Sequence, residues 1–178
     1  KIKSSTNSST YRGDIKTGIT VAILVDVPVG KNLFLQPGVN WTQKGSLNKE
    51  SIGNLTYKTI LTVNYIEIPL NLVYKFNGCF IGAGASVFQA MEGHQKTNEN
   101  GETKKEDVPL GNKETDAMRQ LDFGVNLLAG YELPAGIFLS VTFNQGLRNL
   151  SPQKFDDVTI KSTCHYFGIR LGYLIKGK

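Results

Sequence analysis

Apolar and polar residues alternate along two neighbouring segments in the middle of the chain, residues 65–76 and 79–88. Strict alternation predicts β-strands, because successive side chains of a strand point to opposite faces of a sheet. The dipeptide Asn77-Gly78 joins the segments and favours a two-residue turn, since both turn residues need positive φ angles. On the first segment Ile66, Ile68, Leu70, Leu72, Tyr74 and Phe76 share one face, and Glu67, Asn71 and Lys75 lie on the other. These residues predict a β-hairpin with one apolar and one polar face.

The same alternation predicts further strands on both sides of this hairpin. They are residues 17–27, 33–44, 117–133, 137–150 and 160–175, with a weak first strand over residues 1–10. Pro37 and Pro69 lie inside predicted strands, and because proline cannot donate a ladder hydrogen bond we expect bulges there. No helix of useful length is predicted, and no run of eighteen apolar residues indicates a membrane-spanning helix. The chain is therefore predicted to be all-β.

The connections between the predicted strands alternate between short and long. The short ones are residues 28–32, 77–78 and 134–136, and the long ones are residues 11–16, 45–56, 92–115 and 151–159. In an up-and-down sheet alternate connections emerge at the same end, which places all the short turns at one end. Residues 92–115 are rich in Glu, Lys, Asn, Gly and Thr, and we expect them to form a long mobile loop. This pattern predicts an eight-stranded up-and-down antiparallel transmembrane β-barrel with short periplasmic turns, long extracellular loops and both termini at the short-turn end.

Each face of the predicted barrel has its own chemistry. Aromatic residues lie near strand ends of the apolar face, where they predict an aromatic girdle at the two membrane interfaces. The girdle residues are Trp41, Tyr74, Phe76, Tyr131, Phe143, Phe167 and Tyr173. The polar face combines glycines with charges of both signs, which predicts a small lumen filled by paired charges. The lumen charges are Asp26, Glu67, Lys75, Asp122, Glu132, Arg148 and Arg170. Eight strands leave room for side chains but not for a wide pore.

Alternation alone also fits a soluble lipocalin-like barrel, with the apolar face inside and a small apolar ligand bound there. Three observations favour the membrane: the asymmetry of the loops, the aromatic residues near strand ends, and the crowding of glycines on the polar face. Mean hydropathy is −0.19, which fits a membrane barrel because its alternating strands average to a neutral value.

The length of 178 residues is sufficient for a single domain spanning 1–178. A net charge of +5 raises the question of nucleic acid. The lysines are scattered through predicted loops and strand ends, without a basic helix or an aromatic–basic platform, and we expect no nucleic-acid binding.

The residues that could carry chemistry are few. Cys79 borders a tight turn and Cys164 lies near the opposite end of the last strand, so we expect two free thiols rather than a disulfide. His94 and His165 have no metal-ligand spacing around them, and no nucleophile, base and acid converge in the predicted fold. We expect no metal, no cofactor and no enzymatic activity.

Four stretches resemble a known family. They are residues 35–45 (LQPGVNWTQKG), 65–70 (YIEIPL), 80–84 (FIGAG) and 167–173 (FGIRLGY), of which YIEIPL is the most specific. Together with the leading segment they are similar to the PorT-like outer-membrane β-barrel family of Bacteroidetes, over about residues 1–175. The resemblance implies a secreted precursor whose signal peptide is removed, an eight-stranded barrel in the bacterial outer membrane, and a link to protein secretion through the family's namesake.

We therefore expect a non-enzymatic outer-membrane barrel of structural or interaction type. Its predicted partners are outer-membrane lipid and a protein bound at the long loops, especially residues 92–115, and it is expected to be a monomer. The resemblance adds an accessory role in protein secretion.

Overall fold

The computed structural model describes residues 2–6, 9–12, 14–52, 55–99, 102–111, 113, 116–151, 154–155, 158–159 and 161–174. All regular structure in these residues is β-strand, as predicted. No helix in the described ranges is long and apolar enough to cross a membrane. The strands are β1 (Ile2–Thr6), β2 (Ser9–Arg12), β3 (Asp14–Ile15), β4 (Thr20–Leu24), β5 (Val27–Pro28), β6 (Leu33–Ile52), β7 (Leu55–Phe76), β8 (Cys79–Glu99), β9 (Glu102–Asp107), β10 (Leu121–Glu132), β11 (Ile137–Gly146), β12 (Lys154–Phe155), β13 (Val158–Thr159) and β14 (Lys161–Tyr173).

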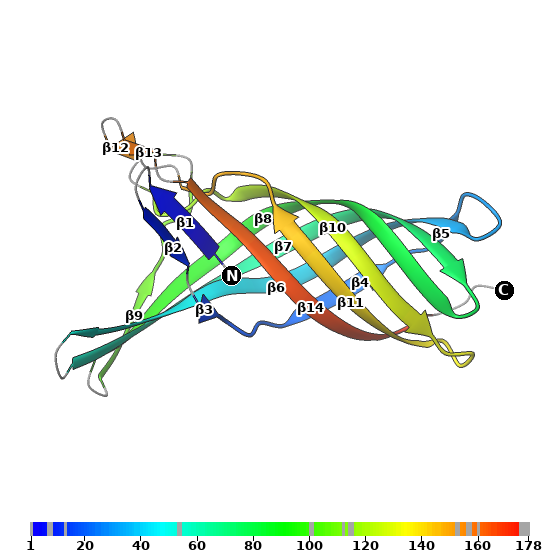
Figure 1. Ribbon diagram of the computed structural model, residues 1–178, viewed down its shortest axis with the longest axis horizontal. Helices are drawn as coiled ribbons and strands as arrows, with labels where there is room; N and C mark the ends of the chain where they lie inside the picture. Colours follow the sequence, from blue (N-terminus) through cyan, green and yellow to red (C-terminus); the bar gives the residue numbers. More distant parts are fainter. Residues whose placement is uncertain are drawn as a thin grey trace.

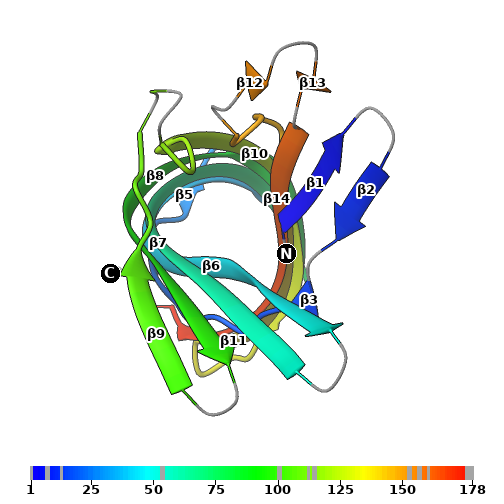
Figure 2. The same cartoon turned by 90° about the vertical axis from the view of Figure 1, so that its left-hand side faces the viewer.

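The long strands form one antiparallel sheet that curls into the wall of a barrel (Figures 1 and 2). The strand order is β2-β1-β14-β11-β10-β8-β7-β6-β3, with β4 and β5 paired along β6 and β9 paired along β8. Strands β12 and β13 form a separate hairpin. Consecutive long strands are neighbours in the sheet, which confirms the predicted up-and-down antiparallel topology.

Tight turns connect neighbouring strands at one end of the barrel wall, called here the turn end. Asn77 and Gly78 both have positive φ angles, 47° and 81°, as the predicted hairpin turn requires. A second turn between β10 and β11 is closed by a hydrogen bond from the Leu133 amide to the Ile137 carbonyl oxygen (2.8 Å). The longer connections lie at the opposite end, called the loop end (Figure 1).

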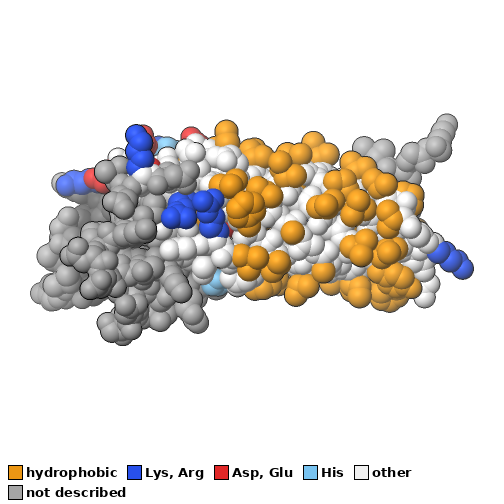
Figure 3. Space-filling view, turned by 90° about the horizontal axis from the view of Figure 1, so that it is seen from above, with side chains coloured by type: hydrophobic (Ala, Val, Ile, Leu, Met, Phe, Trp, Pro, Cys, Tyr) orange, Lys and Arg blue, Asp and Glu red, His pale blue; other side chains and the backbone are white. Residues whose placement is uncertain are grey.

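Burial alternates along the strands and separates two faces. Large apolar side chains are exposed on the outer face, and Figure 3 shows them gathered into a band on the side that faces the viewer. We call this set the apolar band: Val21, Ile23, Val39, Trp41, Ile68, Leu70, Leu72, Ile81, Val87, Phe123, Val125, Leu127, Leu139, Val141, Phe143, Phe167, Ile169 and Leu171. Asparagine, glutamate, serine and threonine side chains are buried on the inner face. The alternative of a soluble barrel with an apolar interior was therefore wrong.

Two small hydrophobic clusters lie inside the barrel. One is near the loop end and contains seven buried residues: Val63, Tyr65, Phe88, Ala90, Met118, Leu150 and Cys164. The other, near the turn end, contains Val73, Phe80 and Leu128.

The first strand differs from the prediction. Residues 1–10 were expected to cross the membrane, but β1 pairs with β2 and with the loop end of β14, through Ile2↔Cys164 to Ser5↔Lys161. Both short strands lie beside the loop end, away from the apolar band (Figure 1). Of the predicted eight strands, the described residues supply seven that cross the band: β4, β6, β7, β8, β10, β11 and β14.

The expectation of a loop over residues 92–115 was wrong for most of the segment. Strand β8 continues to Glu99, and β9 pairs with it from His94↔Asp107 to Glu99↔Glu102. Backbone pairing with the long β7 strand extends the sheet here, so that no apolar core is needed to hold it. The neighbouring segment, residues 45–56, also continues as a hairpin, from Lys44↔Val63 to Ile52↔Leu55.

The bulges expected at Pro37 and Pro69 are absent from the register. The β6–β7 ladder is interrupted after Pro37↔Leu70 and resumes at Asn40↔Glu67 in the same register. Pro69 lies opposite Ser86 in an unbroken part of the β7–β8 ladder, because a proline removes one hydrogen bond without adding a residue. The register shifts instead at Asn64 and Tyr65, where β8 contains one residue more than β7.

Candidate functional site

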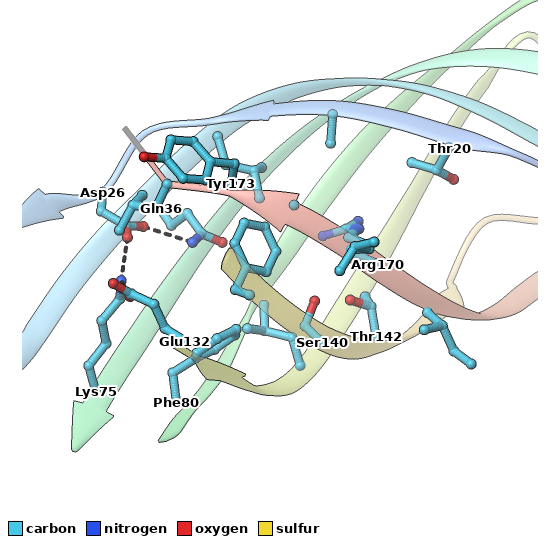
Figure 4. Close-up of a pocket in the computed structure, with 18 residues that line it drawn as sticks. Thr20, Asp26, Gln36, Lys75, Phe80, Glu132, Ser140, Thr142, Arg170 and Tyr173 are labelled. Atoms are coloured by element: carbon cyan, nitrogen blue, oxygen red, sulfur yellow. Dashed lines mark hydrogen bonds and ion pairs between the residues drawn. The ribbon is translucent and has the colours of Figure 1, made fainter. Parts of the chain in front are cut away.

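The inner face near the turn end carries a cluster of three charges. Lys75 Nζ lies 2.7 Å from Asp26 Oδ2 and 3.1 Å from Glu132 Oε2, and these side chains come from the β4–β5 segment, β7 and β10. Gln36 donates a hydrogen bond of 2.8 Å to the other oxygen of Asp26. One lysine thus bridges the carboxylates of Asp26 and Glu132, and Figure 4 shows the cluster at the edge of a cavity.

Glu67 occupies the middle of the lumen and is fully buried. Its carboxylate accepts hydrogen bonds from Thr42 Oγ1 (3.1 Å) and Ser86 Oγ (2.8 Å). The hydroxyl of Tyr166 lies 3.3 Å from both carboxylate oxygens, so that donors from three strands converge on one acid. Hydroxyl groups thus satisfy this buried carboxyl group, and no cationic side chain in the described part of the chain forms an ion pair with it.

Next to Glu67, three asparagine side chains form a chain of amide hydrogen bonds. Asn144 donates to Asn126 Oδ1 at 2.7 Å, and Asn126 donates to Asn71 Oδ1 at 3.0 Å and to Ser86 Oγ at 2.7 Å. Strand β8 lies between Asn71 and Asn126, and its residue at this level is Gly84. A Cβ atom at Gly84 would lie 2.5 Å from Asn71 Oδ1 and closer still to the Leu70 carbonyl oxygen. The amide chain therefore depends on a glycine at this position.

A buried lysine closes the lumen near the loop end. Lys44 Nζ lies 3.1 Å from the centroid of the Phe88 ring, 5.2 Å from that of Tyr65 and 5.1 Å from that of Tyr166. Aromatic faces attract a cation, and this arrangement surrounds the ammonium group with three of them. The Tyr65 hydroxyl also contacts Met118 Sδ at 3.4 Å, which joins the lysine site to the loop-end cluster.

The remaining predicted lumen charges lie near these groups. Asp122 is buried, and its Oδ1 accepts a hydrogen bond of 2.8 Å from the Phe123 amide. Lys44 and Arg148 are close enough to Asp122 to interact with it electrostatically. Arg148 Nη1 donates to the Leu121 carbonyl oxygen at 3.0 Å. Arg170 lies on the cavity side of β14 (Figure 4). Its side chain is within hydrogen-bonding reach of Tyr166.

A cavity of about 210 Å³ lies between the turn-end charge cluster and the middle of the lumen. Its lining includes Thr20 and Ala22 of β4, Thr142 of β11, and Arg170 and Gly172 of β14. Asp26, Lys75 and Glu132 form one of its walls (Figure 4). The cavity reaches the outer face, because Ile169, Leu171 and Tyr173 of the apolar side of β14 also line it.

The residues predicted for the aromatic girdle are all exposed. Tyr74, Phe76, Tyr131 and Tyr173 lie on the strands close to the turn end, and Trp41, Phe143 and Phe167 lie further toward the loop end. Tyr74 and Phe76 contact each other with ring centroids 5.9 Å apart. Cys79 and Cys164 are both free, as predicted.

Two lumen residues were absent from the prediction. Lys44 and Phe88 share the inner parity of their strands, so alternation could have placed them inside, as it placed Asn71 on the polar face. Lys44 contacts rings on β7, β8 and β14 because the sheet is curved, and the sequence pattern does not predict this curvature.

Beyond the apolar band, β6, β7, β8 and β9 continue toward the loop end as residues 45–52, 55–62, 94–99 and 102–107, called here the projecting sheet. Lys49 lies opposite Lys58, and Lys96 lies opposite both Ile60 and Lys105. By alternation these lysines share one face, and all four are exposed. We call Lys49, Lys58, Lys96 and Lys105 the lysine row.

Two acidic residues on the same face interact with a histidine. His94 Nδ1 lies 2.7 Å from Asp107 Oδ1, and His94 Nε2 lies 3.7 Å from Glu92 Oε2. Among the described side chains, no carboxylate forms an ion pair with the lysine row. The row is therefore an exposed cationic surface.

Comparison with known proteins agrees with this architecture. Residues 1–151 match the family model described as outer membrane protein beta-barrel domain. No curated protein and no solved structure matches the chain. The match covers most of the 178 residues, and it agrees with the antiparallel wall, the external apolar band and the polar lumen. The chain belongs to the outer membrane protein β-barrel domain family and is a protein of the bacterial outer membrane.

Proposed function

We propose that this protein is a non-enzymatic, non-conducting outer-membrane barrel that presents the projecting sheet to a protein partner. The observation that carries the proposal is the filled lumen: Glu67 is 0 % exposed and is surrounded by side chains from several strands. A filled lumen leaves no route for solutes, so the surface outside the membrane becomes the functional one. This proposal keeps the long connections as the partner surface, now as strands rather than a loop.

The lysine row indicates an acidic partner. Four exposed lysines on one face of a rigid sheet create a local positive potential, which attracts an acidic polypeptide and orients it. Lys49 is eight residues beyond Trp41 along β6, about 26 Å at ~3.3 Å per residue. That distance places the row beyond the membrane interface, which favours a partner outside the bilayer over a lipid headgroup.

The test uses protein purified from outer membranes and fluorescent poly-L-glutamate as the acidic probe. We expect salt-dependent binding by the natural protein and at least a tenfold weaker affinity for the Lys58→Glu/Lys96→Glu variant. The matched control, Lys31→Glu/Lys104→Glu, changes the net charge equally but alters a turn-end lysine and one on the opposite face of the projecting sheet. Equal losses of affinity in the two variants would mean that net charge alone explains the binding, and would reject a specific site.

Absence of conduction is tested separately. In planar bilayers the purified protein is expected to give no stable single-channel steps, because Glu67 is fully buried among side chains of several strands. Reproducible steps of the kind that porins show would contradict the proposal.

A second candidate role is accessory to protein secretion. It is supported by the resemblance of residues 35–45, 65–70, 80–84 and 167–173 to the PorT-like barrels of Bacteroidetes, described above. If the protein acts there, its deletion should reduce the amount of secreted cargo while other outer-membrane proteins stay at their normal level. Unchanged secretion in the deletion strain would remove this role.

A further inference from the structure

Among the described residues, two strand edges inside the apolar band have no partner strand. β4 pairs with β6 on one side, from Thr20↔Thr42 to Leu24↔Gly38, and β14 pairs with β11, from Gln145↔His165 to Ile137↔Tyr173. β1 covers the second edge of β14 only from Lys161 to Cys164. No ladder joins β4 to residues 166–173 of β14, although all of these residues are described. We call this interruption the seam.

The side chains beside the seam are more exposed than those elsewhere in the apolar band. Leu171 and Ile23 are 77 % and 74 % exposed, whereas Val141 and Phe143 on the fully paired β11 are 41 % and 39 % exposed. The difference is expected where one neighbouring strand is missing from the sheet. It agrees with the cavity, whose lining includes residues of both β4 and β14.

An open seam is costly in a bilayer. Hydrocarbon offers no hydrogen bonds, and each unpaired backbone group costs several kcal/mol, which is why membrane barrels are closed. Lipid tails cannot satisfy these edges, so the occupant of the seam must supply backbone N–H and C=O groups. A β-strand is the occupant that does this along the whole edge.

Strand direction determines how that occupant runs. β4 and β14 both run from the loop end to the turn end, since the seven strands alternate in direction from β4 through β6, β7, β8, β10 and β11 to β14. A direct β4–β14 ladder would therefore be parallel in an otherwise antiparallel sheet. One strand running toward the loop end would pair antiparallel with both edges and raise the number of strands to an even eight.

β1 already stands in line with the seam. It pairs antiparallel with β14 and therefore runs toward the loop end, which is the required direction. We propose that the seam is filled by one further membrane-spanning strand of this protein, the N-terminal continuation of β1 through the residues that precede Lys1. The inference rests on the register of β1 and on the two unpaired edges.

The register predicts the pattern of this strand. Ile2 lies opposite Cys164, so each step back along β1 is a step forward along β14. The residues three, five, seven and nine positions before Ile2 lie opposite Phe167, Ile169, Leu171 and Tyr173, and they are expected to be apolar. The residues four, six and eight positions before Ile2 lie opposite Gly168, Arg170 and Gly172, and they are expected to be small or polar. This length agrees with the ~9–11 residues that a transmembrane strand needs.

The inner side of the seam has room for such side chains. A Cβ at Gly168 would contact only ring atoms of Tyr166, at 3.7 and 3.8 Å. Thr142 Oγ1 is buried and has no hydrogen-bond partner among the described residues. Among the same residues Arg170 forms no ion pair. A polar side chain six positions before Ile2 would lie opposite Arg170.

The experiment is a cysteine cross-link in the natural full-length protein, in a Cys79→Ser/Cys164→Ala background. One cysteine replaces Ile169, and the other replaces the residue five positions before Ile2. Directly opposite residues of an antiparallel pair have the separation that a disulfide requires. We expect an intramolecular disulfide in the outer membrane, and at least fivefold less of it when the second cysteine is moved to four positions before Ile2, on the other face.

Three results would overturn the proposal. An intact mass equal to that of a mature chain beginning at Lys1 would show that no upstream strand is present. A disulfide between Val21→Cys and Ile169→Cys within one chain would show that β4 and β14 close the barrel directly. A covalent dimer from Ile169→Cys alone would show that a second copy fills the seam. Each variant is first checked for the heat-dependent shift of a folded barrel in SDS, so that misfolded protein is not scored.

Discussion

At the scale of single residues, the lumen shows how a polar interior is stabilised inside a membrane. Among the described residues, Glu67 has no cationic partner at hydrogen-bonding distance, and hydroxyl donors on β6, β8 and β14 satisfy it instead. Lys44 is surrounded by aromatic rings rather than by carboxylate oxygens. The two buried groups thus have different surroundings, hydroxyl donors around the carboxyl group and aromatic rings around the amine.

Replacing Glu67 tests the hydroxyl cluster. Glu67→Ala leaves the hydroxyls of Thr42, Ser86 and Tyr166 without their acceptor, and we expect the free energy of unfolding to fall by about 2–4 kcal/mol. Urea unfolding in detergent micelles measures the loss. Glu106→Ala, on the exposed projecting sheet, is the control and should change the free energy by less than about 0.5 kcal/mol. A Glu67→Ala variant as stable as this control would mean that the cluster contributes nothing.

Gly84 provides a second test at this scale. An alanine Cβ would press against the Leu70 carbonyl oxygen, which belongs to the backbone, and against Asn71 Oδ1, which is held by its hydrogen bond from Asn126. We expect Gly84→Ala to lower the free energy of unfolding by about 1–3 kcal/mol, as overpacking does. Gly30→Ala is the matched control, because a Cβ there meets only Leu33 Cβ at 3.4 Å. Equal unfolding midpoints for the two variants would contradict the proposed dependence of the amide chain on Gly84.

At the scale of elements, the strands of the apolar band could be predicted from alternation, and their extensions could not. The residue pattern of 65–76 and 79–88 predicts the central hairpin because one face needs lipid. Residues 94–107 carry no such pattern, since both faces are in water. They form strands because β7 and β8 are long enough to template them by backbone pairing.

Trimming this extension tests its independence from the barrel. Replacing residues 97–104 with Asn-Gly leaves Lys96 and Lys105 beside a tight turn. We expect the unfolding midpoint of the barrel to be unchanged within error, because the hairpin packs no core. Urea unfolding measures the midpoint and the free energy of unfolding. A fall of more than about 1 kcal/mol in that free energy would show that the hairpin supports the barrel.

At the scale of the whole molecule, the apolar band determines that the outer face of the barrel lies in lipid rather than in water. Alternation alone left open which face was inside, and loop asymmetry with the aromatic positions favoured the correct orientation. The strand count was harder to predict, because weak alternation in residues 1–10 cannot show that β1 lies beyond the band. Only the register with β14 reveals it.

Electrophoresis checks this scale directly. A closed membrane barrel resists SDS until it is heated, so boiled and unboiled samples of the protein refolded in detergent should migrate differently. We expect two separated bands and precipitation when detergent is removed. Identical bands, together with solubility in plain buffer, would contradict the outward apolar band.

The chain of amides from Asn71 through Asn126 to Asn144 has a consequence for assembly. A slip of one residue between strands exchanges the two faces and is strongly rejected by lipid, but a slip of two keeps apolar residues outside and costs little there. The amide donors and acceptors meet only in the native alignment. While the strands are being inserted, these three side chains can therefore distinguish the correct alignment from near misses that the membrane itself would accept.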